Sequence, residues 1–248
     1  MITELIIILP ILWLCWKGII PWTVIIIYTI FIYWIPKNLI IKLLEYFYPE
    51  IITRNHSQTS IFLTFDDMPY GSHQNIIEIL NKHQMKATFF IISEYVNEEN
   101  IDIFVNAVKM GHQLGNHGKT NSMHLLKSDI ELVKEINHCD SVIKDIYRRA
   151  RMPLPQNMIY RPGCGLFGPS MLNIVSNLGY KIALGSVYPN DAVISSETIN
   201  YWYLISHLEP GDVVIMHDRK WTPNMLDNLL TWMHTHNLES SVLDKIFR

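Results

Sequence analysis

The N-terminal part of the chain is almost uniformly apolar. Between Leu5 and Ile35 the only charged side chain is Lys17. A membrane-spanning helix needs ~20 mainly apolar residues, and residues 19–35 with their flanks nearly supply that length. Prolines interrupt the run, so a single span and a short helical hairpin both remain open. The pattern predicts a hydrophobic membrane anchor, and the few basic residues that follow it leave open on which side of the membrane the rest of the chain lies.

A second apolar pattern follows directly, with the spacing of a helix. Leu39, Leu43 and Phe47 recur at every fourth position, which places them on one face of an α-helix. Such an amphipathic helix can lie on a membrane surface or pack against a folded domain, and the pattern does not decide between the two. We therefore predict two parts: residues 1–48, the anchor and the amphipathic helix, and residues 49–248, the main domain.

In the main domain, short apolar runs alternate with segments of helical periodicity. Strands that are apolar on both faces are typical of a parallel sheet. A full eightfold barrel uses ~250 residues, and fewer remain after the first 48. We therefore predict an α/β fold with a reduced or distorted (β/α) barrel of about seven parallel strands. The predicted strands are Ile61–Phe65, Ala87–Ile92, His112–Gly115, Met158–Arg161, Lys181–Gly185, Val213–Met216 and a short one near Val242, and the predicted helices are His73–Gln84, Ile101–Met110, Ser128–Arg149, Pro169–Leu178 and Asn224–His236.

Charge and cysteine content argue against a nucleic-acid partner and against a cysteine-based structural site. The formal net charge is −3 and the sequence has no Lys/Arg-rich run, so nothing favours nucleic acid as a partner. Cys15, Cys139 and Cys164 are too scattered for a disulfide framework or a CxxC zinc site. We interpret all three as free thiols.

Two adjacent aspartates, Asp66 and Asp67, follow the predicted strand Ile61–Phe65. On a regular strand they would point to opposite faces, but a turn at the strand end can bring both into one pocket. Like charges at close range destabilise each other unless a metal ion or a proton offsets the repulsion. The alternative is a structural role at the start of the next helix, and the pair alone does not decide between the two.

Four more polar clusters follow other predicted strands. They are Asn116-His117, Arg161-Pro162-Gly163, Asp191 and His217-Asp218. The carboxyl ends of parallel strands meet at one rim of a barrel, so we expect these side chains to share a pocket with the two aspartates.

The order and spacing of these clusters resemble the polysaccharide deacetylases, the NodB-type domain of carbohydrate esterase family 4. Thr64–Pro69 (TFDDMP) is similar to the TFDDGP motif of that family, and Gly115–His117 to its GNH metal motif. Arg161–Gly163 is similar to its arginine motif, and Val214–Asp218 (VIMHD) to its final LLHD motif. The stretch Arg161–Asp191 further resembles a branch of small deacetylase-like proteins. The resemblance covers the chain from about residue 49 to the C-terminus.

By this resemblance the chain is a metal-dependent hydrolase that removes acetyl groups from N-acetylated amino sugars of a polysaccharide or glycan containing N-acetylglucosamine. A metal-bound water would be the nucleophile, with Asp66 as the general base and His217 as the general acid. Arg161 would hold Asp66, and Asp191 would raise the pKa of His217.

The same resemblance assigns the metal to Asp67, His117 and a third ligand. Zinc is expected, with cobalt or another divalent ion as the alternative. The family usually has a second histidine four residues after the first, where this chain has Asn121, and His124 lies three residues further on. The register favours Asn121, but an amide is a poor zinc ligand, so we expect metal binding to be weakened or lost.

Met68 stands where the family motif has glycine, and it would strain the loop if that position needs a positive φ. Together with Asn121, this departure leaves a second function open: a catalytically silent relative that binds a glycan or a protein partner through the same cleft. A third possibility is a membrane-embedded scaffold protein whose N-terminal segment is the functional part.

Overall fold

The computed structural model describes residues 37–247, together with Gly18 and Thr23. The chain divides into two units, Met1–Phe47 and Tyr48–Arg248. In the first unit helix α3, Lys37–Phe47, forms where the sequence predicts the amphipathic helix. The predicted membrane anchor falls on residues outside the described part, and no helix within that part has the length and apolarity to cross a membrane.

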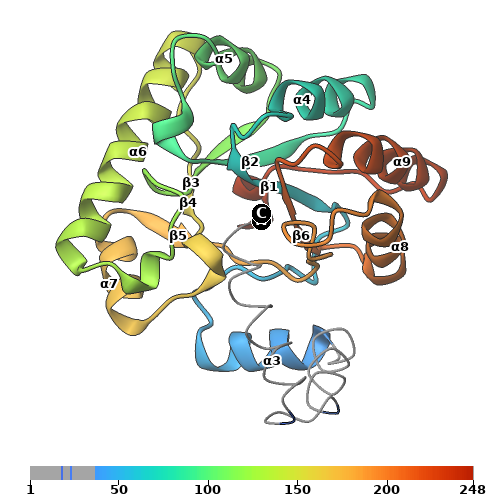
Figure 1. Cartoon of the computed structure of the whole chain (residues 1–248), viewed down its shortest axis with the longest axis horizontal. Coiled ribbons are helices and arrows are strands. Elements are labelled where there is room, and N and C mark those ends of the chain that lie inside the picture. The colour runs from blue at the N-terminus through green and yellow to red at the C-terminus, as the bar shows by residue number, and fades with distance from the viewer. Residues whose placement is uncertain (1–17, 19–22, 24–36, 248) are drawn as a thin grey trace. The chain divides into compact units, whose positions relative to one another are not determined.

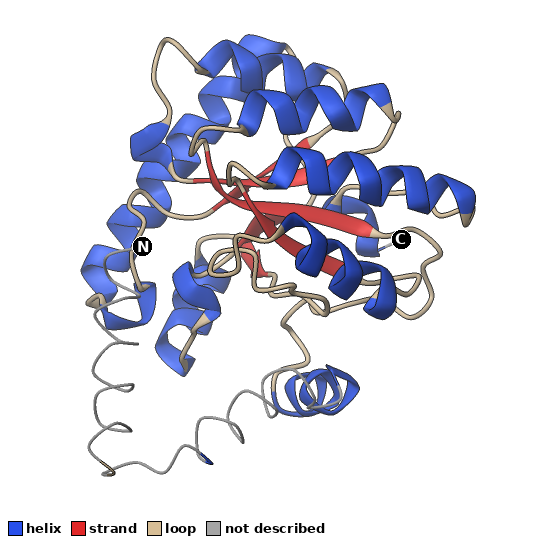
Figure 2. Cartoon of the chain, turned by 45° about the vertical axis from the view of Figure 1, so that its right-hand side comes forward, coloured by secondary structure: helices blue, strands red, loops and turns tan. Residues whose placement is uncertain are grey.

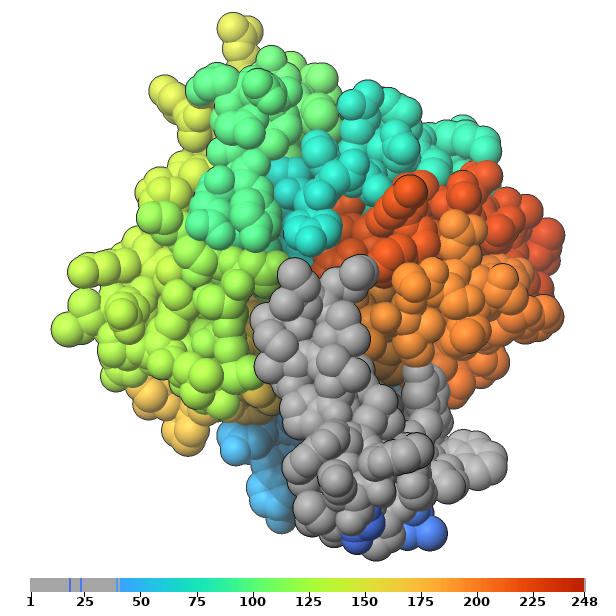
Figure 3. Space-filling model, viewed as in Figure 1, coloured from blue at the N-terminus to red at the C-terminus, as the bar shows by residue number. Residues whose placement is uncertain are grey.

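The second unit is built on a parallel sheet, which in the described residues has six strands in the order β5-β4-β3-β2-β1-β6. The sheet curls into a half-barrel, and the helices pack around its outer side (Figures 1 and 2). On the face drawn in Figure 3, α5 and α6 form one side of the surface and α8 and α9 the other. The predicted α/β class with a distorted barrel of parallel strands is confirmed, with six strands in the described residues instead of about seven. The strands are β1 Phe62–Met68, β2 Ala87–Ile91, β3 Gln113–Asn116, β4 Met158–Tyr160, β5 Tyr180–Ile182 and β6 Val213–His217; the helices are α4 His73–Lys82, α5 Ile101–Lys109, α6 Asp129–Ala150, α7 Pro169–Asn177, α8 Glu197–His207 and α9 Thr222–Thr235; and the 3₁₀ helices are η1 Ser93–Tyr95, η2 His124–Leu126, η3 Gly163–Gly165 and η4 Leu243–Phe247.

The chain between β5 and β6 partly closes the open side of the half-barrel. Ala183 forms a bridge with Ile52, and Val187 forms one with β6. Gly185 permits this close approach, because a Cβ at that position would lie 2.5 Å from Ile215 Cγ1. The sheet is therefore closed by isolated bridges and not by a continuous strand, which makes the barrel distorted, as the chain length predicts.

Side chains of β1 alternate between two environments. Leu63 and Phe65 belong to the main apolar core between sheet and helices, whereas Phe62 belongs to a second apolar cluster formed by several strands on the inner face. By the two-residue period of a strand, Thr64 and Asp66 share the inner face with Phe62. The barrel interior is thus apolar at the start of β1 and polar toward its carboxyl end.

The prediction of a seventh strand near Val242 is wrong. That segment makes a single bridge between Ser240 and Ile61 and then forms η4. Strand β1 is already paired along both edges, with β2 and β6, so it has no free edge for another strand. The sequence reading also missed helix α8, whose first turn is capped by the Ser196 side chain accepting the Ile199 N–H.

Candidate active site

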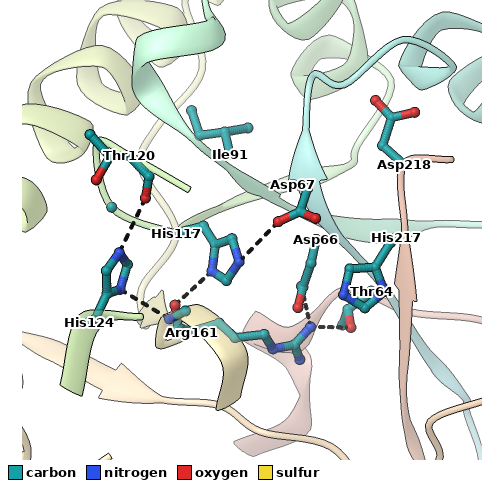
Figure 4. A network of polar contacts seen from close by, with 12 residues as sticks. Thr64, Asp66, Asp67, Ile91, His117, Thr120, His124, Arg161, His217 and Asp218 are labelled. Atoms are coloured by element: carbon teal, nitrogen blue, oxygen red, sulfur yellow. Dashed lines mark hydrogen bonds and ion pairs between the residues drawn. The ribbon is translucent and has the colours of Figure 1, made fainter. Parts of the chain in front are cut away.

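The two adjacent aspartates lie inside strand β1, and not after its end as predicted. Across the β1–β2 pair, Phe65 lies opposite Phe89 and Met68 opposite Ile91, so β1 has one residue more than its neighbour. The extra residue makes a β-bulge, in which Asp67 has a left-handed backbone with a φ of 62°. This irregularity breaks the strict alternation and lets both carboxylates reach the same cluster (Figure 4).

The bulge also determines which residue of this motif has the left-handed backbone, and that residue is not Met68. Met68 is not among the residues with positive φ, and its side chain is fully buried in the main apolar core. The left-handed position of this motif is Asp67, a residue type that tolerates that conformation better than most. The predicted strain at Met68 is therefore absent.

Arg161 is buried and holds Asp66 in place. Its Nη1 donates to Asp66 Oδ1 at 2.7 Å and to Thr64 Oγ1 at 2.6 Å. Its Nε and Nη2 donate to the carbonyl oxygens of Ala183 and Leu184. Burial lowers the pKa of Arg161, and the charge of Asp66 opposes that shift. Arg161 engages one oxygen of Asp66, which leaves the other oxygen to accept a proton.

His117 lies beside Asp67 with one ring nitrogen facing the carboxylate. Its Nδ1 donates to the carbonyl oxygen of Arg161 at 2.7 Å, because a carbonyl can only accept. Its Nε2 lies 3.6 Å from Asp67 Oδ1. Two ligands that bond a metal at ~2.0–2.2 Å can be this far apart, and a backbone hydrogen bond to the other ring nitrogen is typical of metal-binding histidines. Asp67 and His117 therefore fit two ligands of one divalent cation.

The charges around this pair shift both pKa values. Burial by itself raises the pKa of Asp67, but His117, and after it His217 and Arg219, outweigh burial and lower that pKa. Burial by itself lowers the pKa of His117, but Asp67 and Asp66 outweigh it and raise that pKa. The site thus favours a positive charge between the Asp67 carboxylate and the His117 imidazole, either a proton or a metal cation.

His124, the alternative third ligand, has both ring nitrogens occupied. Its Nδ1 accepts from the Tyr160 hydroxyl at 2.6 Å and from the Gly163 N–H at 3.0 Å. Its Nε2 therefore carries the hydrogen and faces the Thr120 carbonyl oxygen at 3.4 Å. Burial, and after it the charge of His117, lower the pKa of His124 to about 4. His124 is a neutral structural residue that joins the loop after β3 to the loop after β4.

Asn121, the predicted third ligand, lies at an exposed position of the loop between β3 and η2. Its side chain lies beside the Tyr95 hydroxyl, and Tyr95 is in turn close enough to Asp67 for the charge to raise its pKa, after burial and Glu94. The loop is therefore at the edge of the site, and coordination by Asn121 stays a prediction. Among the described residues no three His, Cys, Asp or Glu side chains are placed to hold a metal.

The sequence reading missed Glu135, which anchors this loop from helix α6. The Glu135 carboxylate accepts the N–H of Lys119 at 2.9 Å and the N–H of Thr120 at 2.8 Å, and it pairs with Lys127 Nζ at 3.0 Å. The sequence does contain a sign of this role, because Glu135 is an acidic residue on the apolar, buried face of a long helix, next to Ile136. Glu135 fixes the backbone that carries the third-ligand position.

His217 ends strand β6 opposite Asp66, its register partner on β1. Its Nδ1 donates to Asp191 Oδ1 at 2.8 Å, and its backbone N–H donates to Asp191 Oδ2 at 2.7 Å. Burial by itself lowers the pKa of His217, but the fully buried Asp191 outweighs it and raises that pKa. The structure thus brings the predicted acid and its predicted partner together, with His217 Nε2 left for the substrate.

The two residues after His217 have different partners. Asp218 is fully buried and points away from the cluster (Figure 4), where it accepts the backbone N–H groups of residues 70–72. Arg219 instead donates from Nη2 to Asp67 Oδ2 at 2.6 Å. The sequence reading missed Arg219, although a cation directly after a polar pair at a strand end was a usable signal.

The separate roles of the two histidines can be tested by replacing each with glutamine. His117→Gln is expected to abolish zinc or cobalt binding, measured by isothermal titration calorimetry. His124→Gln is expected to keep metal binding but to lower the free energy of unfolding by about 1–3 kcal/mol, because it disturbs buried hydrogen-bond donors. Loss of metal binding in a folded His124→Gln variant would contradict this assignment.

Comparison with known proteins identifies the family of this chain. Residues 53–183 match the family model described as polysaccharide deacetylase. A chitooligosaccharide deacetylase from Azorhizobium caulinodans is 29% identical over 170 residues, which cover 67% of this chain and 76% of that protein. The peptidoglycan-N-acetylmuramic acid deacetylase PdaA from Bacillus subtilis is 26% identical over 174 residues, which cover 68% of this chain and 64% of that protein.

Two solved structures share the fold. A family 4 acetyl xylan esterase from Clostridium thermocellum, solved in complex with a cobalt ion, has a TM-score of 0.66 at 25% identity, covering 75% of this chain and 89% of that chain. A CE4 family pseudoenzyme from Bacillus anthracis has a TM-score of 0.70 at 21% identity, covering 80% of this chain and 69% of that chain.

Proposed function

This chain belongs to the polysaccharide deacetylase family, and we propose that it hydrolyses the acetamido group of N-acetylated amino sugars in a glycan. One observation carries the proposal. Asp66, held by Arg161, and His217, held by Asp191, are register partners on neighbouring strands at one end of the sheet. The relatives named for chitooligosaccharide and peptidoglycan deacetylation support an acetylated glycan as the substrate class.

The reaction needs a proton acceptor on one side of the acetyl group and a proton donor on the other. Water adds to the acetyl carbonyl carbon and the C–N bond breaks, which releases acetate and a free amine. Asp66 takes the proton of the attacking water on the oxygen that Arg161 does not bind, and protonated His217 donates from Nε2 to the leaving nitrogen. Asp67 and His117 would hold a divalent cation, which would supply charge stabilisation at the acetyl oxygen and a lower pKa for the water.

The proposal is tested by acetate release from the purified full-length chain. The substrates are acetylated chito-oligosaccharides and peptidoglycan, with zinc or cobalt added. We expect acetate release that stops when a chelator removes the metal and resumes when the metal is restored. No release from either substrate, at any metal concentration, would contradict the proposal.

The surroundings of the two candidate metal ligands, Asp67 and His117, support a second candidate function. Within the described residues, a third His, Cys, Asp or Glu ligand is not placed beside Asp67 and His117, and Asp67 already pairs with Arg219. A catalytically silent protein that binds a glycan or a protein partner through the same cleft would have these features. It would show saturable binding of chito-oligosaccharides by calorimetry and no acetate release with any metal.

Asp191→Asn is expected to move the alkaline limb of the pH profile to lower pH. The Asp191 carboxylate raises the pKa of His217 against the effect of burial, and only protonated His217 can donate to the leaving nitrogen. Activity is therefore lost as pH rises through the pKa of His217, and removing the carboxylate lowers that pKa. The measurement is kcat/KM for acetate release against pH. Asp227→Asn, which removes a half-buried carboxylate on α9 paired with Lys82 and His83 outside the site, is the matched control. An unmoved limb in Asp191→Asn would contradict the assignment.

A further inference from the structure

Arg219 is held at three points beside the candidate metal ligands. Its Nη2 donates to Asp67 Oδ2 at 2.6 Å, and its Nη1 donates to the Asp218 carbonyl oxygen at 3.1 Å. Its guanidinium carbon lies 4.7 Å from the centre of the Tyr70 ring, within the range of a cation–π contact. The side chain is only 16% exposed. Arg219 is therefore fixed in the site and is not a solvated surface arginine.

Asp67 lies between the His117 imidazole and the Arg219 guanidinium. Asp67 Oδ1 faces His117 and Asp67 Oδ2 faces Arg219. The negative charge that should attract a divalent cation is already balanced by the guanidinium. A cation that binds Asp67 also meets repulsion from Arg219, and that repulsion is strong where water is largely excluded. His117 is neutral when it serves as a ligand, so it adds no charge to help.

We propose that Arg219 is a resident counter-ion of Asp67 that competes with the divalent cation for this carboxylate and thereby sets the metal affinity of the site. The proposal rests on the proposed function, because the cation is the one that Asp67 and His117 would hold. A cation held between Asp67 Oδ1 and His117 Nε2 would share the carboxylate with the guanidinium on Oδ2, so the two positive charges compete for one negative charge. The Tyr70 ring and the Asp218 carbonyl oxygen hold the guanidinium beside Asp67, so its charge stays next to the candidate metal position.

The test compares metal affinity in the full-length chain and in Arg219→Gln, measured by isothermal titration calorimetry with zinc and with cobalt. We expect the variant to bind metal at least about tenfold more tightly, which corresponds to ~1.4 kcal/mol. The metal-free variant should melt at a lower temperature than the parent, because Asp67 has lost its partner. A fixed cobalt concentration should then raise the melting temperature more in the variant than in the parent.

Lys220→Gln is the matched control, because it makes the same change in net charge at the exposed neighbouring position. Its metal affinity should stay within about twofold of the parent. Equal or weaker binding in Arg219→Gln, the same tightening in Lys220→Gln, or no metal binding by any of the three proteins would each overturn the proposal. Acetate release is measured separately: tighter metal binding in Arg219→Gln without any acetate release would uphold this inference and reject the proposed function.

Discussion

Asp66→Asn is expected to lower kcat/KM for acetate release by about 10²–10⁴-fold, the usual contribution of a positioned general base. Asparagine keeps the shape of the side chain, and its carbonyl oxygen can still accept from Arg161 Nη1. It cannot take a proton from water at the oxygen that the aspartate leaves unbound. The measurement is acetate release from acetylated chito-oligosaccharides at saturating metal, with a melting curve to show that the variant is folded.

Thr64→Val is the matched control for that experiment. Thr64 accepts from the same Arg161 nitrogen, at 2.6 Å, so both variants disturb a partner of one guanidinium. Valine has nearly the shape of threonine, and the Thr64 hydroxyl donates its hydrogen to the Val214 carbonyl oxygen at 2.6 Å and takes no proton from water. The kcat/KM of Thr64→Val should therefore fall by less than about tenfold. A folded Asp66→Asn variant that keeps more than a tenth of the parent activity, or a Thr64→Val variant that loses as much as Asp66→Asn, would contradict the base assignment.

The strand and helix pattern of the main domain could be predicted because it depends on local periodicity. The apolar strand Ala87–Ile91 and the amphipathic helix Ile101–Lys109 lie within a residue of their predicted bounds. The number of strands could not be predicted in the same way. Whether the segment near Val242 pairs depends on whether β1 has a free edge, and that is a property of the whole sheet.

The position of the candidate site residues was predictable, but their local geometry was not. Asp66, His117 and His217 do gather at one end of the sheet, because parallel strands place their carboxyl ends together. The route by which Asp67 joins them is a bulge with a left-handed residue, which the alternation of a regular strand does not reveal. The role of His124 depends on partners that lie 36 and 39 residues away in the sequence.

Arg219 and Glu135 show a different limit of sequence reasoning. Both are charged residues that act through contacts with a loop or strand distant in the sequence, Arg219 with Asp67 and Glu135 with Lys119 and Thr120. A motif identifies residues of the expected type at the expected place, so it does not reveal a cation that pairs with a candidate metal ligand. Such a contact becomes visible only when the fold brings the two charges together.

Arg161→Met is expected to lower the free energy of unfolding by about 3–5 kcal/mol, which is the cost of removing one partner of a buried ion pair. Arg161 is 2% exposed and Asp66 is 5% exposed, so the Asp66 carboxylate would be left buried without its cation. The carbonyl oxygens of Ala183 and Leu184 would also lose their donor. The measurement is urea-induced unfolding of the full-length chain near neutral pH, compared with the parent.

Two further variants separate the buried charge from other effects of that substitution. Arg148→Met removes an arginine of similar size that pairs with Asp145 on the exposed side of α6, and an exposed pair contributes only about 0–1 kcal/mol. The double variant Asp66→Asn with Arg161→Met removes both buried charges, so it should be more stable than Arg161→Met alone. Two results would show that the uncompensated carboxylate does not cause the loss of stability in Arg161→Met: a double variant less stable than the single one, or an equal loss in Arg148→Met. In either case Arg161 stabilises the fold mainly by packing and by its hydrogen bonds to the two carbonyl groups.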